Sequence, residues 1–306
     1  MMAMLNSVYN MTKTLKLFST AIGSEITYGV TLNWSRITHD GKYGAFPIIT
    51  ADTKCVIIMI HGMNSSSGQF QLHMNEIEKY NTDHNQCIKM FIPEVLNKGM
   101  TKLHDCGNDI YSKISSHLDV IHKQKIPVIL IGISNGGRIA LYLYSKIMDN
   151  YSEIHLYVTT LGSPIKGTYL ANIALNSGLY RLTKYASNPD VLSDLTYDSE
   201  ESKQLIEKCM KYSNFKSKTR FYVSKQDFLV FPHTCGIMDN HDNQIVDGVG
   251  HDGLVMYFYK EQVMWCINIA ENNVQIDEQF QNMYLPLIET SVPTQILICD
   301  MEFSME

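Results

Sequence analysis

Short apolar runs alternate with stretches of helical spacing along most of the chain. The run Cys55 to Ile60 is rich in β-branched residues, a composition typical of a strand buried on both faces of a sheet. The other runs of this kind are residues 88–92, 128–131, 154–161, 220–224 and 243–249. Between them, residues 103–123, 141–148 and 254–270 repeat apolar residues at the spacing of a helix face. Strands and helices in alternation predict an α/β fold with a mostly parallel central sheet and helices on both faces.

Three segments fall outside this alternation. Residues 11–22 could form an amphipathic helix, and Ile26 to Trp34 alternates loosely as a strand would. Residues 165–218 are too long for a simple connection and carry helical patterns at 169–175 and 200–212, the second after an Asp198-x-x-Glu201 capping box. We interpret this segment as a helical cap or lid insertion. Residues 275–306 are peripheral, with a possible strand at 295–299.

Composition and charge narrow the class of protein. Hydrophobic residues make up 45% of the 306 residues and charged residues 18%, which is usual for a soluble globular protein. The formal net charge of -6 argues against nucleic acid as a partner. The seven cysteines have no C-x-x-C pattern, and the N-terminus has no clear signal peptide or membrane span. These features predict a cytoplasmic protein with free thiols, although non-classical export stays open.

The most informative motif is Gly132-Ile133-Ser134-Asn135-Gly136, a G-x-S-x-G sequence between a buried strand and a helix. A serine on such a sharp turn projects its hydroxyl above the sheet, where a substrate carbonyl can reach it. A Cβ at Gly132 or Gly136 is expected to clash, because strand and helix lie close together there. The N–H of Asn135, at the helix start, would point at an oxyanion.

A second motif follows the first strand, where His61-Gly62-Met63 opens a polar loop rich in serine and glycine. In serine hydrolases of this architecture the equivalent loop supplies the other oxyanion-hole N–H, for which Met63 is the candidate. We interpret His61 as a structural residue of the loop and not as a second base. The alternative is an ordinary strand-to-helix loop with Ser and Asn as helix caps.

A nucleophilic serine needs a base, and the base needs an anionic partner that fixes its tautomer. Asp227 follows one predicted strand and His251 follows the next, which gives the chain order Ser, Asp, His. Asp247, four residues before His251, is an alternative to Asp227. No H-E-x-x-H or equivalent spacing indicates a metal site, and no cofactor is expected.

These motifs together resemble the α/β-hydrolases of the lipase/esterase type. The resemblance covers about residues 53–270 and includes Leu161-Gly162-Ser163-Pro164. It implies a single α/β-hydrolase domain over residues 1–306, with peripheral extensions at 1–50 and 275–306. It also implies a triad of Ser134 as nucleophile, His251 as base and Asp227 as the acid. Two features depart from the family pattern, Met63 after the His-Gly pair and the unmatched C-terminal residues.

The resemblance further implies a serine carboxyl-ester hydrolase that works through an acyl-enzyme on lipid-like acyl esters. The apolar residues expected to contact the acyl chain are Leu170, Ile173, Leu179 and Leu182. An acyltransferase or thioesterase would use the same triad, and a non-catalytic ligand-binding protein could share the fold. Peripheral contact with a membrane is possible for a lipid substrate, and the sequence does not indicate an oligomeric state.

Overall fold

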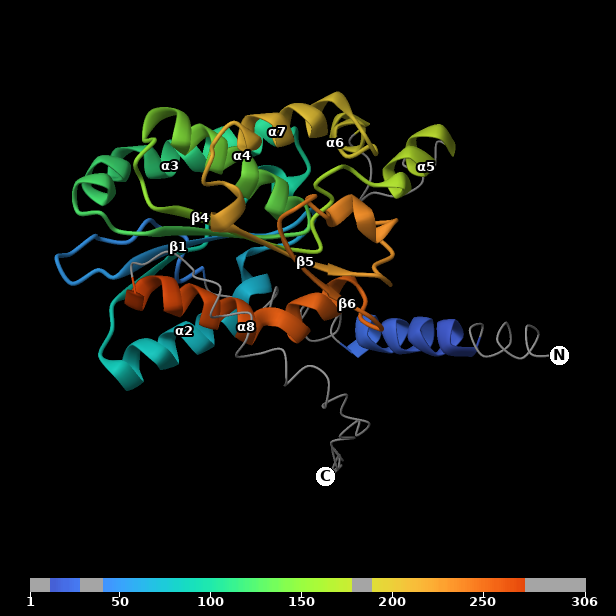
Figure 1. Ribbon diagram of the computed structural model, residues 1–306, viewed down its shortest axis with the longest axis horizontal. Coiled ribbons are helices and arrows are strands. Elements are labelled where there is room, and N and C mark those ends of the chain that lie inside the picture. The colour runs from blue at the N-terminus through green and yellow to red at the C-terminus, as the bar shows by residue number, and fades with distance from the viewer. Residues whose placement is uncertain (1–11, 28–40, 178–188, 273–306) are drawn as a thin grey trace, which may run out of the picture. The chain divides into compact units, whose positions relative to one another are not determined.

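A sheet of six parallel strands, in the order β2-β1-β3-β4-β5-β6, forms the centre of the fold (Figure 1). The computed structural model describes residues 12–27, 41–177, 189–272 of the chain. The strands are β1 (Cys55–Ile60), β2 (Ile88–Phe91), β3 (Val128–Ile133), β4 (Leu156–Leu161), β5 (Thr219–Ser224) and β6 (Asp242–Val246). The helices are one over residues 12–27, then α2 (Gln71–His84), α3 (Leu103–Lys123), α4 (Asn135–Asn150), α5 (Tyr169–Ser177), α6 (Pro189–Asp194), α7 (Glu200–Met210) and α8 (His251–Asn272).

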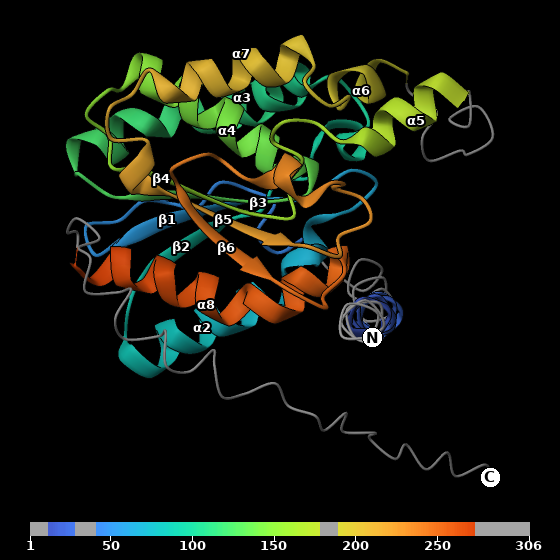
Figure 2. The ribbon, with the colours of Figure 1, turned by 45° about the vertical axis from the view of Figure 1, so that its right-hand side comes forward.

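Helices cover both faces of the sheet, as the alternation of apolar runs predicted. Figure 1 and Figure 2 show α3, α4 and α7 over one face and α2 and α8 over the other. All residues of β1, β3, β4 and β5 are buried. Burial on both faces explains why the sequences of β1 and β3 are continuous apolar runs and not alternating ones. The predicted fold class, an α/β-hydrolase fold with a parallel sheet, is confirmed.

Backbone segments approach each other closely at the turn between β3 and α4. A Cβ on Gly136 would overlap the carbonyl oxygen of Ile60 in β1, and a Cβ on Gly132 would overlap the backbone of Gly137. The two glycines of the G-x-S-x-G motif are therefore required by packing, as the sequence indicated. Between them Ser134 has φ 55° and ψ -129°, a conformation that costs a non-glycine residue about 1–3 kcal/mol.

The segment between β4 and β5 is helical, and a buried arginine attaches it to α4. Arg138 donates hydrogen bonds to the Pro164 carbonyl (3.1 Å), the Asp194 carbonyl (2.8 Å) and the Ser202 hydroxyl (2.8 Å). Burial lowers the pKa of Arg138 to about 10. Because a buried guanidinium needs these acceptors, Arg138 fixes the ends of α6 and α7 against the helix that follows the serine turn.

Three local expectations were wrong. The first helix continues through residues 26 and 27, where a strand was expected, and the rest of the expected strand lies outside the described residues. The N-cap of α7 is Ser199, whose hydroxyl accepts from the Ser202 N–H at 3.2 Å, and not Asp198. Asp198 instead has φ 59° and pairs with Lys203. The short helix α6 was not expected, and the possible strand at 295–299 lies outside the described residues.

We expect Gly136→Ala to lower the free energy of unfolding by about 1–3 kcal/mol, because the added methyl group must displace the end of β1. Urea unfolding followed by circular dichroism measures the change. Gly23→Ala is the matched control, since a Cβ there has no heavy atom within 4 Å and alanine favours the helix. Equal stability of the two variants would contradict the packing argument.

Candidate active site

The proposed nucleophile and the candidate oxyanion loop lie next to each other. An ideal Cβ on Gly62 would lie 2.8 Å from Cβ of Ser134 and 3.4 Å from its hydroxyl oxygen. Ser134 begins the turn into α4, with its own N–H donated to the carbonyl of Leu161 in the neighbouring strand at 2.8 Å. The elbow thus places the Ser134 side chain at the carboxyl edge of the sheet, beside the loop that follows β1.

The backbone of Gly62 is fixed from both sides. Its N–H donates to Gln69 Oε1 at 3.1 Å, and its carbonyl lies 2.8 Å from His61 Nδ1. His61 is fully buried, and its Nε2 lies 3.0 Å from the Val95 nitrogen and 3.2 Å from Glu94 Oε2, while its Nδ1 faces the Gly62 carbonyl. His61 therefore acts as a structural residue of this loop, and because the peptide is planar it also sets the direction of the Met63 N–H.

The two candidate oxyanion donors are the backbone N–H groups of Met63 and Asn135. Within the described part of the chain, the backbone N–H groups of Met63 and Asn135 have no protein acceptor. Asn135 is the first residue of α4, where a helix leaves its N–H groups unpaired. The Met63 side chain packs against an apolar cluster of the cap, formed by Ala171, Val191, Leu192 and Leu195. Their role as an oxyanion hole stays a prediction.

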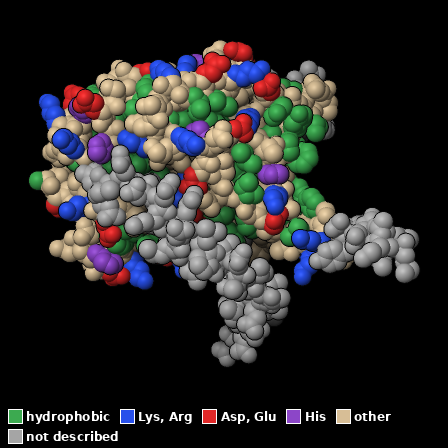
Figure 3. Space-filling model, viewed as in Figure 1, with side chains coloured by type: hydrophobic (Ala, Val, Ile, Leu, Met, Phe, Trp, Pro, Cys, Tyr) green, Lys and Arg blue, Asp and Glu red, His purple; other side chains and the backbone are tan. Residues whose placement is uncertain are grey.

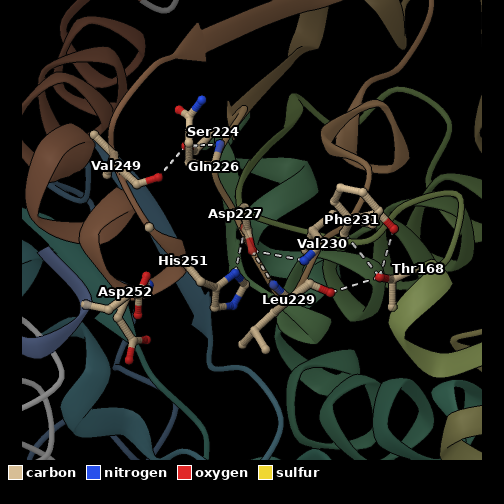
Figure 4. A network of polar contacts seen from close by, with 12 residues as sticks. Thr168, Ser224, Gln226, Asp227, Leu229, Val230, Phe231, Val249, His251 and Asp252 are labelled. Carbon is tan, nitrogen blue, oxygen red and sulfur yellow. Dashed lines mark hydrogen bonds and ion pairs between the residues drawn. The ribbon is translucent and has the colours of Figure 1, made fainter. Parts of the chain in front are cut away.

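Asp227 and His251 form a buried hydrogen-bonded pair. Asp227 Oδ2 lies 2.7 Å from His251 Nδ1, and the two side chains are 1% and 7% exposed. The other carboxylate oxygen, Oδ1, accepts from the N–H groups of Leu229 (2.8 Å) and Val230 (2.9 Å), as Figure 4 shows. A carboxylate accepts the Nδ1 proton, so Nε2 of His251 is the nitrogen left to accept a proton.

The pair lies over the strand next to that of the serine. An ideal Cβ on Gly162 would be 3.1 Å from both Asp227 Oδ2 and His251 Nδ1. Gly162 directly follows Leu161, which pairs with Ile133 in the register of β3 and β4. Ser134 and Gly162 are thus neighbours at the ends of adjacent strands. Among the described residues, no hydrogen bond joins the Ser134 hydroxyl to His251.

The loops that carry Asp227 and His251 are also joined to each other. The Ser224 hydroxyl donates to the Val249 carbonyl and accepts the Gln226 N–H at 3.1 Å (Figure 4). The Gln226 side chain in turn accepts the Gly248 N–H at 2.6 Å. These contacts, which the sequence did not reveal, fix the distance between acid and base through side chains of the loop itself.

The alternative acid, Asp247, points to a different partner. Its carboxylate pairs with Lys225 Nζ at 3.0 Å, and both side chains are about half exposed. The geometry therefore favours Asp227 as the partner of His251.

The electrostatics of His251 follow from burial and from nearby carboxylates. Burial disfavours the imidazolium, but the charge and hydrogen bond of Asp227, with further charge from Asp252 and Glu25, outweigh it and raise the pKa of His251 to about 9. Neither Glu25 nor Asp252 was singled out by the sequence for this site.

The four predicted acyl-contact residues have different outcomes. Leu170 and Ile173 lie on α5, exposed by 40% and 55%. Leu179 and Leu182 lie outside the described residues.

Over residues 12–27, 41–177 and 189–272, no group of three or more His, Cys, Asp or Glu side chains is arranged to hold a metal ion. In the same ranges, no helix is both long and apolar enough to cross a membrane.

The parallel sheet has this strand order, the serine elbow follows β3, and the Asp and His residues follow β5 and β6. This is an α/β-hydrolase fold. No protein-family model and no curated protein sequence matches the chain.

Several solved hydrolases are similar in structure. Phospholipase PlaB from Legionella pneumophila matches with 17% identity and a TM-score of 0.44, over 56% of this chain and 39% of that protein. The mature lipase BlEst2 from Bacillus licheniformis matches with 16% identity and a TM-score of 0.49, over 71% of this chain and 95% of that protein. A soluble variant of monoglyceride lipase from Saccharomyces cerevisiae matches with 13% identity and a TM-score of 0.42, over 72% and 89%.

We expect Asp227→Asn to remove a pH-dependent part of the stability. A histidine whose pKa rises from 6.5 to about 9 on folding stabilises the fold fully below pH 6.5, and this contribution is lost as the pH rises through about 9. The difference in free energy of unfolding between wild type and Asp227→Asn should therefore be largest near pH 6 and shrink above about pH 9.

Urea unfolding across this pH range measures the difference. Asp247→Asn is the matched control, because it removes a carboxylate from the neighbouring loop that pairs with Lys225 and not with His251. A gap between wild type and Asp227→Asn that stays constant with pH would contradict the assignment of this pair.

Proposed function

We propose that the chain is a serine carboxyl-ester hydrolase that acts through an acyl-enzyme. The observation that carries the proposal is the buried Asp227–His251 hydrogen bond beside a serine turn in the same carboxyl edge of the sheet. In doubly wound α/β sheets this edge is where ligands bind. Ser134 is the nucleophile, His251 the general base and Asp227 the residue that orients the base.

In the first half of the reaction, Ser134 Oγ attacks the ester carbonyl carbon while His251 Nε2 takes the hydroxyl proton. The negative oxygen of the tetrahedral intermediate accepts hydrogen bonds from the N–H groups of Met63 and Asn135. His251 then gives its proton to the leaving alcohol, and the acyl group stays on Ser134. Asp227 remains a carboxylate throughout and stabilises the imidazolium.

In the second half, His251 takes a proton from water, and the resulting hydroxide attacks the acyl-enzyme carbonyl. The same two N–H groups hold the second oxyanion, and the proton returns to Ser134 as the carboxylic acid leaves. An acyltransferase would admit an alcohol in place of water at this step, and a thioesterase would release a thiol in the first half.

The proposed substrates are lipid-like acyl esters. Support comes from exposed apolar side chains beside the proposed site, on α5 and in the loop after Asp227. Figure 3 shows hydrophobic side chains gathered over α5 and the segments next to it. The exposed members are Tyr169, Leu170, Ile173, Phe228, Leu229 and Phe231. Thr168 joins the two segments, since its hydroxyl donates to the Leu229 carbonyl at 2.9 Å.

Ser134→Ala should lose about 10⁴-fold or more of the turnover of a p-nitrophenyl ester, because no other group can form the acyl-enzyme. Labelling by a fluorophosphonate probe should be lost with it. Ser163→Ala is the matched control, since this serine follows the end of the next strand but its side chain is buried. Full hydrolysis by Ser134→Ala would refute the assignment of Ser134 as the nucleophile. Absence of both hydrolysis and labelling in the wild type would favour a non-catalytic binding protein.

We expect kcat/KM for p-nitrophenyl esters to rise from acetate to octanoate. Each buried methylene contributes about 0.8 kcal/mol, so four additional methylenes could raise kcat/KM roughly 10²-fold. Replacing both Leu170 and Ile173 by Ala should reduce this slope. Val120→Ala, an exposed apolar residue on α3, should leave the slope unchanged. Values that fall steadily with chain length would instead indicate a short-chain esterase.

A further inference from the structure

The helix over residues 12–27 packs on the protein through a face that carries both apolar and polar side chains. Ala21 is buried, and Leu17, Ser24 and Glu25 are partly buried, at the spacing of one helix face. Figure 1 and Figure 2 both place this helix beside the beginning of α8, where His251 lies. Polar side chains such as Ser24 and Glu25 are unusual on the docking face of a surface helix, and they indicate specific contacts at the point where it docks.

Two hydrogen bonds from this helix hold the backbone on both sides of His251. The Gly250 N–H donates to Ser24 Oγ at 3.0 Å, and the Asp252 N–H donates to Glu25 Oε1 at 2.9 Å. The Ser24 hydroxyl proton goes to the Ala21 carbonyl at 2.7 Å, which leaves its lone pairs directed at Gly250. The residues before and after His251 are thus both held by neighbouring residues of one distant segment.

The glycines of the sequence Gly250-His251-Asp252-Gly253 make room for this contact. A Cβ on Gly250 would overlap the Glu25 carboxylate, and a Cβ on Gly253 would lie 2.8 Å from Ser24 Oγ. Gly250 before the histidine and Gly253 after it therefore have no side chain at the places where Glu25 and Ser24 approach. This explains the Gly-His-Asp-Gly sequence, of which the proposed chemistry requires only the histidine.

The same helix also touches the loop that carries the acid. The rings of Phe18 and Phe228 have centroids 5.7 Å apart, and Phe228 directly follows Asp227. Helix 12–27 therefore contacts both the acid loop and the base loop. An element that packs against both can fix one relative to the other.

Charge adds to the geometry. Glu25 accepts from the second N–H of α8, and a carboxylate at a helix N-terminus is stabilised by the unpaired N–H groups and the helix dipole. Burial and the Asp252 charge raise the pKa of Glu25, while His251 acts against this shift. The carboxylates that act on the imidazole are Asp227 after β5, Asp252 on α8 and Glu25 on helix 12–27.

We propose that helix 12–27 is a positioning element of the active site, in which Ser24 and Glu25 fix the backbone around His251 and Glu25 adds negative charge that favours its imidazolium. The inference rests on the proposed role of His251 as general base. Ser24 and Glu25 act through His251 and do not touch the substrate.

Proton NMR titration of the His251 ring in the full chain tests whether the Glu25 charge favours the imidazolium of His251. The His251 resonance is assigned by its loss in His251→Gln. Glu25→Gln keeps an oxygen that can accept the Asp252 N–H but removes the charge, so we expect the midpoint to fall by roughly 0.3–1 pH unit. Glu153→Gln, which removes an exposed charge before β4 at the opposite edge of the sheet, should leave the midpoint unchanged. The acid limb of kcat/KM should move to lower pH by the same amount in Glu25→Gln.

Steady-state kinetics test the backbone contact. Ser24→Ala should lower kcat roughly threefold to tenfold with KM unchanged, the scale of one lost hydrogen bond. Ser19→Ala is the matched control, because Ser19 makes the same bond to a carbonyl three residues back in the helix but is exposed. Ser24→Ala carries no charge change, so its pH profile should keep the wild-type midpoint.

Coincident His251 titrations in wild type and Glu25→Gln would overturn the role of Glu25, and equal kcat in Ser24→Ala and Ser19→Ala would overturn that of Ser24. The titration needs no turnover. A wild type without Ser134-dependent hydrolysis would therefore refute the proposed function, while the titration would still decide whether Glu25 acts on His251.

Discussion

The contact between Gly136 and the carbonyl of Ile60 is the constraint on which the site depends. It lets α4 begin directly against the end of β1, and it forces Ser134 into a strained conformation at the tip of the turn. The same close approach places Gly62, two residues after Ile60, against the Ser134 side chain. One packing contact therefore positions the serine, the first N–H of α4 and the candidate oxyanion loop together. This strain is tolerated because the fully buried strands on both sides leave the turn no alternative position.

The Asp227–His251 pair depends on a different kind of support. Asp227 lies in the loop after β5, and His251 is the first residue of α8, directly after the loop that follows β6. Loops are held less firmly than strands. Here each loop backbone is held by side chains: Ser224 and Gln226 join the two loops, and Thr168 joins the acid loop to the start of the cap. The parallel sheet brings the two loops to one edge, and these polar contacts fix the distance between Asp227 and His251. The serine is thus placed by packing and the acid–base pair by hydrogen bonds.

The sequence predicts the parts of this arrangement that are local. Buried strands appear as continuous apolar runs, and the glycines at 132 and 136 identify the turn that they make possible. The choice of acid is not local. Asp227 follows the predicted strand 220–224, and Asp247 lies in the run 243–249, four residues before His251. Only tertiary geometry separates the aspartate that meets His251 from the one that meets Lys225. The prediction of the N-cap of α7 was wrong for a similar reason. Asp198 and Ser199 are both good capping residues, and the backbone conformation decides between them.

Helix 12–27 shows why the contacts that support His251 from outside its own loop could not be predicted from the sequence. Its apolar residues Leu15, Phe18, Ile22 and Ile26 recur on one face, and periodicity alone would bury that face. In the structure these side chains are 37–66% exposed, although Phe18 also contacts Phe228. The helix docks mainly through Leu17, Ala21, Ser24 and Glu25. Periodicity reports which side of a helix is apolar, but the docking side is chosen by the partner surface. Here the partner surface presents the N–H groups of Gly250 and Asp252, which donate to the Ser24 hydroxyl and the Glu25 carboxylate. Apolar side chains could not accept these hydrogen bonds. The backbone of the histidine loop therefore selects the polar face, more than two hundred residues away along the chain.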